Sequence, residues 1–480
     1  MTWADLSLIA PELALAAAAC AALLQDAWAT GPALESRSRG PAAAWIALGG
    51  VCAALLLLGV RPAGAAQVGF AGMYVRDGIT RVVDLAALAA AGLGVMLSPP
   101  YLERFRLPAG EYHALLLLST AGAMLMGASR NLVLLFLGLE MLSFPLYVLA
   151  ALARRSRRSQ EAGLKYLLLG AFATAFFVYG VALVYGASGT ADLSRLGRAP
   201  DVPLLHAGVA FLVIGLGFEA ALVPFHAWAP DVYEGAPMPA TAFMSVIAKV
   251  GAFAGLLRLF PQALPQLAPA WGQMLAAIAV ATMILGNLAA LAQSNVKRLL
   301  AYSGVAHAGY ILIGIASGGP AGSSAVLYYL LVYVAMNLGA FGVLLLLERR
   351  GEEADRVEDL AGLLGRAPWA AVVLAACMVS LAGLPPTAGF IAKLYLFRAA
   401  LQDHRVALAL VGALTSVVSV YYYLRVASVA LSAGAADAVA VRHSRFAGVG
   451  LALAAAGVLW LGIVPGAITA LVQQAVQALR

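Results

Sequence analysis

The chain has 480 residues, of which 63% are hydrophobic and only 11% are charged, and its formal net charge is +7. This composition excludes a soluble globular protein, whose surface needs more charged residues. Apolar runs of about 20 residues recur along the chain, each long enough to cross a bilayer core of roughly 30 Å. The alternating segments of about ten residues that mark a transmembrane β-barrel are absent. The sequence therefore predicts an all-α polytopic membrane protein.

The apolar runs predict about 14 transmembrane helices in a single membrane domain, residues 1–480. The first run lacks a basic segment and a small-residue cleavage pattern, so we predict a retained span and not a signal peptide. The predicted spans are 6–28, 41–60, 78–97, 111–128, 131–152, 161–187, 204–225, 238–260, 271–291, 297–317, 322–347, 368–398, 405–431 and 446–466.

Prolines interrupt two of these spans, at Pro224 in the seventh and at residues 384–386 (LPP) in the twelfth. A proline removes a backbone donor, and the carbonyls that it frees must find partners inside the membrane. The two broken spans lie five apart, so they cross the membrane in opposite directions. This pattern predicts two inverted five-helix repeats. The predicted units are helices 1–3 in residues 1–100, helices 4–8 in 110–260, helices 9–13 in 271–431 and helix 14 in 446–480.

Basic residues predict the orientation. Sixteen of the 30 lysines and arginines follow odd-numbered spans, ten lie on the opposite side and four lie inside spans. Because cytoplasmic loops carry the excess of lysine and arginine, the odd loops are predicted to be cytoplasmic and both termini to lie outside. The densest basic stretch, RRSRRS at 154–159, is interpreted as a topology anchor, with a lipid or partner contact as the alternative.

Motifs for metals, redox cofactors and nucleotides are missing from the sequence. Cys20, Cys52 and Cys377 lie in apolar spans at unrelated spacings, and no CxxC occurs. No P-loop is found, and the six histidines are scattered without pairing. Iron–sulfur, zinc, haem and nucleotide sites are therefore not expected in this chain.

Charged residues inside the spans are the main functional signal. They include Glu140, Lys165, Glu219, Lys249 and Lys393. Each charge at the bilayer centre costs on the order of 2.5–3.5 kcal/mol on insertion scales, so such residues usually serve ion or proton pathways. Lys165 lies near enough to a span end to reach the interface by snorkelling, which is the structural alternative for that residue.

The segment after Pro224 carries His226, which titrates near neutral pH and could link a Glu140/Glu219 pair to Lys249. A structural histidine at the end of the broken helix is the alternative. The following stretch, APDVYEGAP at 229–237, is predicted to be a cytoplasmic turn in which Asp231 and Glu234 are well solvated.

Three long stretches carry a family resemblance: ALVPFHAWAPDVYEGAPMPATAFMS, NVKRLLAYSGVAHAGYILIG and AGLPPTAGFIAKLYLF. They resemble the antiporter-like membrane subunits of respiratory complex I, the NADH–quinone oxidoreductase. The last stretch, with its lysine, and the opening LIAPELAL most resemble the subunit N branch of bacteria.

The resemblance implies a proton-translocating subunit in the membrane arm of complex I, in a bacterial inner (plasma) membrane beside sibling antiporter-like subunits. In that family a glutamate on span five, lysines on spans seven and eight and a lysine or glutamate on span twelve form a charged axis. Glu140, Lys249 and Lys393 match three of these positions, and Lys165 and His226 match further polar positions. FMN, iron–sulfur clusters and quinone would be bound by partner subunits.

Glu219 departs from the family pattern, because relatives have a lysine before VPFH. Two carboxylates about 4 Å apart would repel by roughly 4 kcal/mol at an effective dielectric constant near 20. Three hypotheses follow: Lys165 becomes the counter-ion, one carboxylate holds a proton, or this copy pumps weakly. Other function classes left open are a free-standing cation/proton antiporter, a structural spacer within the complex and a substrate transporter.

Overall fold

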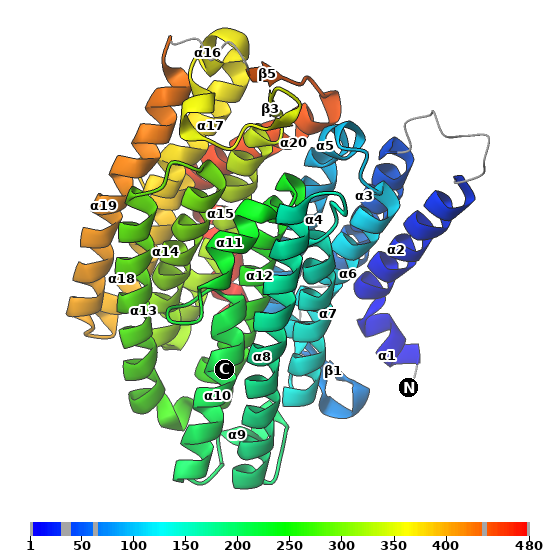
Figure 1. The fold of residues 1–480 in the computed structure, drawn as a ribbon. Coiled ribbons are helices and arrows are strands. Elements are labelled where there is room, and N and C mark those ends of the chain that lie inside the picture. The colour runs from blue at the N-terminus through cyan, green and yellow to red at the C-terminus, as the bar shows by residue number, and fades with distance from the viewer. Residues whose placement is uncertain (1–2, 30–39, 61–65, 434–438, 478–480) are drawn as a thin grey trace.

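The computed structural model describes residues 3–29, 40–60, 66–433 and 439–477. These residues form a bundle of long helices with a small β-sheet at each end (Figure 1). Within the described ranges, 11 helices are long and apolar enough to cross a membrane. The three other predicted spans correspond to α6, which has Glu111 in its first turn, and to two helix pairs that are each divided by a break.

The N-terminal part packs two of its helices against the side of the bundle (Figure 1). Its helices are α1 (Trp3–Leu8), α2 (Ala10–Ala29), α3 (Gly40–Gly59), α4 (Gly78–Leu97) and α5 (Pro99–Arg104). A hairpin of β1 (Gln67–Gly69) and β2 (Tyr74–Arg76) precedes α4, with Gln67 opposite Arg76. Asp77 begins α4 through a capping box with Thr80, which satisfies donors that the helix itself leaves free.

The first set of five spans contains the first break. Its helices are α6 (Ala109–Ala128), α7 (Leu132–Ala150), α8 (Arg157–Ser188), α9 (Leu193–Leu196), α10 (Pro203–Glu219), α11 (Trp228–Gly235) and α12 (Met238–Leu257). Span seven is divided into α10 and α11, and the segment between them contains Pro224, as predicted. The predicted turn at 229–237 is wrong, because most of that stretch belongs to α11.

The second set of five spans contains the second break. Its helices are α13 (Ala268–Leu291), α14 (Val296–Ser317), α15 (Gly319–Leu344), α16 (Leu363–Arg366), α17 (Pro368–Ala382), α18 (Ala388–Gln402) and α19 (Val406–Leu431), and short helical turns lie at η2 (Arg258–Ala263), η3 (Pro265–Leu267) and η4 (Val357–Leu360). The break between α17 and α18 confirms the predicted interruption at 384–386. Gly383 ends α17 with φ of 81°, a conformation that glycine adopts without strain.

The C-terminal part differs from the single helix predicted at 446–480. It forms α20 (Arg445–Ile463) and a second helix, α21 (Gly466–Gln477), because Pro465 interrupts the chain between them. Helix α21 packs so closely on α4 that a Cβ at Gly78 would lie 2.3 Å from Cα of Ala475.

A second sheet, which the sequence analysis missed, closes the opposite end of the bundle from β1 (Figure 1). Its strands, in the order β4-β3-β5, are β4 (Glu352–Glu353), β3 (Leu347–Arg349) and β5 (Val439–Val441). Leu347 lies opposite Val441 in antiparallel register. The sheet therefore joins the loop after α15 to the loop after α19.

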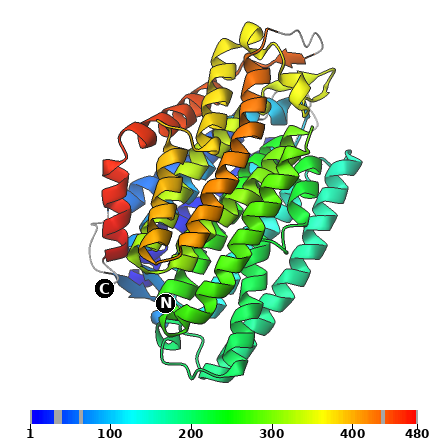
Figure 2. The ribbon, with the colours of Figure 1, turned by 90° about the vertical axis from the view of Figure 1, so that its left-hand side faces the viewer.

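Helix α12 lies at the centre of the structure, and each of its residues is buried. It contacts helices of both five-span sets as well as α4. Figure 2 shows the same bundle from the side, with the helices running roughly parallel to one another. A charge on α12 is therefore enclosed by protein on all sides.

A close contact between two helices offers a test of the fold. At Gly122 in α6, an added Cβ would lie 2.3 Å from the backbone nitrogen of Leu142 in α7. Gly122→Ala should therefore push these helices apart and destabilise the protein by about 1–3 kcal/mol, seen as a lower thermal unfolding midpoint. Gly49→Ala in α3 is the control, because nothing lies within 4 Å of its added Cβ. Equal midpoints for the two variants would contradict this packing.

Candidate functional site

Lys249 on α12 is the most deeply placed charge of the candidate site. Its side chain is only 1% exposed, and its Nζ donates to the backbone oxygen of Ser245 at 3.4 Å. The ring centre of Tyr333 lies 5.7 Å from Nζ. Lys249 forms no ion pair with any residue in the described ranges. A titratable group buried in a membrane-spanning helix without a bonded carboxylate usually belongs to an ion or proton pathway.

One carboxylate of the first set of helices interacts with Lys249, and a second carboxylate lies near the first. Glu219 is buried at the end of α10, directly before the break, and accepts from Ser143 Oγ at 2.9 Å and Tyr166 OH at 3.5 Å. Glu140 on α7 is half-buried and accepts from Thr174 Oγ1 at 2.6 Å. Glu219 interacts electrostatically with both Glu140 and Lys249. The structure thus brings these three predicted residues together.

Lys165 lies apart from this group. Its Nζ forms ion pairs with Glu161 at 2.8 Å and Asp231 at 3.0 Å, and its side chain is 42% exposed. The hypothesis that Lys165 is the counter-ion of Glu219 is therefore wrong for this structure, because other carboxylates already hold the ammonium. This arrangement fits a lysine near the end of its span.

Helix α11 also carries a bridge between the two helix sets. Arg298 on α14 binds Asp231 at 2.8 Å and Glu234 at 3.0 Å. These carboxylates, predicted to be well solvated, are therefore engaged in ion pairs. The reason is that α11 packs on both α8 and α14, which places their basic residues beside it.

His226 occupies the break between α10 and α11. Its ring lies against the backbone of Pro224, and its buried Nδ1 has no hydrogen-bond partner in the described chain. The ring makes no hydrogen bond to Glu140, Glu219 or Lys249. Since Glu219 and Lys249 interact directly, the structure does not support the predicted link through His226.

His307 on α14 is a buried site residue that the sequence analysis missed. Its Nδ1 lies 2.6 Å from Tyr329 OH, and its Nε2 lies 2.9 Å from Tyr423 OH. It interacts electrostatically with both Lys249 and Lys393, and we therefore place it between these two lysines. The sequence feature that could have identified His307 is its position as a lone titratable residue within an apolar span.

Lys393 on α18 is held by the second break. Its Nζ donates to the backbone oxygens of Ala382 at 2.9 Å and Leu381 at 3.2 Å, and to Ser416 Oγ at 2.8 Å. The two carbonyls belong to the last turn of α17, where a helix leaves its carbonyls free and favours a cation. The ring centre of Tyr310 lies 4.9 Å from Nζ. The break therefore provides the binding groups of the lysine.

Buried hydroxyl and amide groups fill the space around these charges. Tyr422 OH donates to Asn287 Oδ1 at 3.0 Å, and Asn287 Nδ2 donates to Tyr310 OH at 3.1 Å. The hydroxyl of Tyr333 and Oδ1 of Asn337 are buried with no partner among the described residues. Such orphaned groups are where proteins place ordered water. The series Glu140, Glu219, Lys249, His307, Lys393 is thus surrounded by groups that can pass protons.

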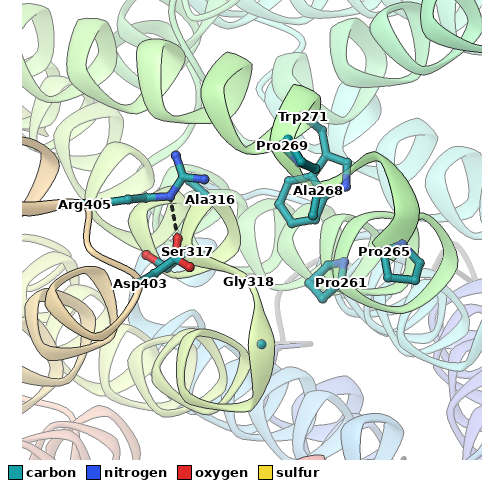
Figure 3. A pocket seen from close by; sticks show the side chains of 11 residues that line it. Pro261, Pro265, Ala268, Pro269, Trp271, Ala316, Ser317, Gly318, Asp403 and Arg405 are labelled. Atoms are coloured by element: carbon teal, nitrogen blue, oxygen red, sulfur yellow. Dashed lines mark hydrogen bonds and ion pairs between the residues drawn. The ribbon is translucent and has the colours of Figure 1, made fainter.

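A surface pocket of about 390 Å³ lies outside this series. Figure 3 shows it where α13 begins, α14 ends and α18 turns into α19. Asp403 and Arg405 form an ion pair of 2.6 Å at its wall. None of the five titratable residues in the series from Glu140 to Lys393 lines this pocket. No group of three or more potential metal ligands occurs among the residues described.

The comparisons with known proteins agree with this geometry. Residues 129–419 match the family model "NADH:quinone oxidoreductase/Mrp antiporter, TM". The chain belongs to this family.

Two relatives and one solved structure show how far the similarity extends. NADH-quinone oxidoreductase subunit N 2 of Roseiflexus castenholzii is 45% identical and covers 85% of each chain. NADH-quinone oxidoreductase subunit N of Trichlorobacter lovleyi is 42% identical over 98% of this chain and 97% of its own. A chain of respiratory complex I from Thermus thermophilus is 35% identical, with a TM-score of 0.81 over 96% of this chain and 98% of its own. The family resemblance inferred from the motifs is therefore confirmed.

Glu219 offers a direct test of the site. Glu219→Gln keeps the shape of the side chain but cannot carry a negative charge. Its amide oxygen can accept from one of the two hydroxyls, Ser143 and Tyr166, and its NH2 can donate to the other, so the fold should survive while proton translocation is largely lost. The measurement is NADH-driven acidification of membrane vesicles that contain the variant complex. Glu358→Gln, an exposed carboxylate in η4, is the control and should pump normally. Normal pumping by Glu219→Gln would remove Glu219 from the pathway.

Proposed function

We propose that the chain is the subunit-N-type, proton-translocating subunit in the membrane arm of an NADH–quinone oxidoreductase. Its proton route would run through Glu140, Glu219, Lys249, His307 and Lys393. The observation that carries this proposal is the buried ammonium of Lys249, which interacts with Glu219 on one side and His307 on the other. The similarity to subunit N relatives over nearly the whole chain supports the same assembly.

Protons would move by successive changes of charge at these residues. When Lys249 holds a proton, its positive charge favours the ionised form of a neighbouring carboxylate. The same charge disfavours the protonated form of a neighbouring lysine, because charges interact strongly inside a protein. The hydroxyls of Ser143 and Tyr166 stabilise Glu219 as a carboxylate, and three oxygens stabilise Lys393 as an ammonium. A proton that arrives on a neighbouring group therefore strengthens the carboxylate form of Glu219 and weakens the ammonium form of Lys393.

The Glu140/Glu219 pair would share one proton. This choice follows from the repulsion of two nearby carboxylates and from the engagement of Lys165 elsewhere. Electron transfer from NADH to quinone, with its FMN and iron–sulfur clusters, would take place in partner subunits. Sibling antiporter-like subunits would be the neighbours in the membrane.

We also propose that spans four to eight (110–260) and nine to thirteen (271–431) are inverted repeats. Support comes from the breaks, which divide the fourth span of each set. A charged residue of the series lies beside each break: Glu219 precedes the first, and Lys393 binds carbonyls at the second.

The proposed location is a bacterial inner (plasma) membrane, with the odd-numbered loops in the cytoplasm and both termini outside. Basic residues of several such loops meet at the end that carries the β4-β3-β5 sheet. Arg104 and Arg442 both pair with Glu348, and Lys297 pairs with Glu353. Arg37 and Arg39, which also contributed to this prediction, lie outside the described residues. The clustering supports one cytoplasmic face.

Purification tests the assembly. The tagged chain, taken from gently solubilised membranes, should elute in a large complex that oxidises NADH and contains flavin and iron. Elution as a lone, colourless protein would instead favour a free-standing cation/proton antiporter.

Lys249 tests the pathway within that complex. Lys249→Met keeps the length of the side chain without its charge, so the complex should assemble while proton translocation falls to background and NADH–quinone activity declines. Vesicle acidification and native gels measure these quantities. Met244→Leu, a volume-conserving change on the same buried helix, should leave both nearly unchanged. A Lys249→Met complex that pumps normally would identify the chain as a structural spacer.

Single cysteines test the orientation. After Cys20, Cys52 and Cys377 are replaced by serine, Asp201→Cys in the loop after α9 should react with a membrane-impermeant maleimide on spheroplasts. Glu358→Cys in the loop after α15 should react only once the membrane is opened, because that loop is proposed to be cytoplasmic. Both positions are exposed in the structure. The reverse labelling pattern would invert the proposed topology.

A further inference from the structure

A second buried charged cluster lies outside the proposed route. It joins α2, β2, α4 and α12 at the end of α12 that is farther from the ion pairs of α11 (Figure 1). Its titratable and charged members are Glu12, Tyr74, Arg76, Asp77, Asp84 and Arg258. In the proposed orientation this is the outer end of the bundle, near the N-terminus.

In one half of the cluster, which we call the closed half, the charged groups bind one another. Arg258, which directly follows α12, binds both oxygens of Asp77 at 2.6 and 2.8 Å. It also donates to Gly127 O at 2.7 Å and Thr80 Oγ1 at 2.8 Å. This part ties α4, α6 and α12 together, with charge and hydrogen bonds matched on both sides.

In the other half, which we call the open half, several buried polar atoms have no hydrogen-bond partner among the described residues. Asp84, fully buried in α4, accepts from Arg76 Nη2 at 3.1 Å through Oδ2. Its Oδ1 has no hydrogen-bond partner in the described parts of the chain, and neither do Nε and Nη1 of the buried Arg76. A buried carboxylate oxygen without a donor is unfavourable, so this site requires a further group.

The atoms of Asp84 and Arg76 that have no partner in the described parts of the chain determine what this further group can be. Water can accept from Arg76 and donate to Asp84, and a proton on Asp84 satisfies the oxygen directly. A metal cation is disfavoured, because the guanidinium of Arg76 remains charged and lies against the carboxylate. Tyr74 OH donates to Glu12 at 2.8 Å, and Glu12 Oε2 lies 3.7 Å from Arg76 Nη2, so both residues add to the polar surroundings.

The position of the cluster relates it to the route. Arg258 follows Lys249 by nine residues, or about 14 Å along the helix. Helix α4 packs directly on α12, since a Cβ at Gly94 would lie 3.3 Å from the Phe243 ring. Asp84 of the open half thus lies on a helix that flanks the Lys249 helix, and Arg76 lies on β2, which precedes that helix.

We propose that Asp84 and Arg76 form a water-containing proton-binding site through which protons leave the chain toward the outer face. This inference rests on the proposed function. Asp84 takes up a proton and becomes neutral, then returns it to water, while Arg76 stays charged and positions the carboxylate. The closed pair of Asp77 and Arg258 holds the surrounding helices in place.

The test compares Asp84→Asn with Asp77→Asn in the complete complex. Asp84→Asn should assemble, and its proton translocation should fall several-fold, while Asp84→Glu should restore it. In infrared difference spectra, acidification should produce a carboxylic-acid band that is lost in Asp84→Asn and shifted in Asp84→Glu. Asp77→Asn should keep this band, because its carboxylate is held by Arg258.

Normal pumping by Asp84→Asn, or a band that neither Asp84 variant changes, would overturn the inference and leave the cluster a structural clamp. If Asp84→Asn fails to assemble, the band shift in Asp84→Glu still decides. The outcome for Lys249→Met separates the two proposals. Normal pumping by Lys249→Met would refute the proposed function, whereas its loss beside normal pumping in Asp84→Asn would refute only the outer site.

Discussion

The buried ammonium of Lys249 is the constraint on which the structure depends. A charge at this depth is unfavourable unless protein or water surrounds it, and here helices of both sets enclose α12 completely. Two titratable groups, Glu219 and His307, interact electrostatically with Lys249, and the carboxylate of Glu219 does so without forming an ion pair with it. A tight pair would fix the proton in place, whereas this looser arrangement leaves the lysine able to change its charge.

At the two broken spans, backbone groups provide the polar surroundings that buried charges need. Each break ends a helix inside the bundle and leaves carbonyl groups without partners in their own helix. At the second break those carbonyls bind Lys393, and at the first the helix ends at Glu219. Interrupted helices thus supply the polar surroundings that an unbroken apolar helix cannot provide, and neighbouring helices keep these groups away from lipid.

Much of the fold and part of the site were predictable because their signals are local. Apolar runs, the prolines of both breaks and the isolated charges Glu140, Lys249 and Lys393 can each be read from a single segment. The partners of Lys165 and the strands β3 and β5 could not be predicted in this way, because they join residues far apart in sequence. His307 was missed for another reason: the sequence shows only a lone histidine in an apolar span, and its contacts with Tyr329 and Tyr423 are visible only in the fold.

The pocket around Glu219 has an evolutionary consequence. Its side-chain hydrogen-bonding groups are the hydroxyls of Ser143 and Tyr166, and a hydroxyl can either donate or accept. Rotation of two O–H bonds would let the same hydroxyls accept from an ammonium, the group that the family resemblance leads us to expect at this position. The two hydroxyls therefore do not fix the sign of the charge at this position, and the neighbouring charges of Glu140 and Lys249 are left to decide it.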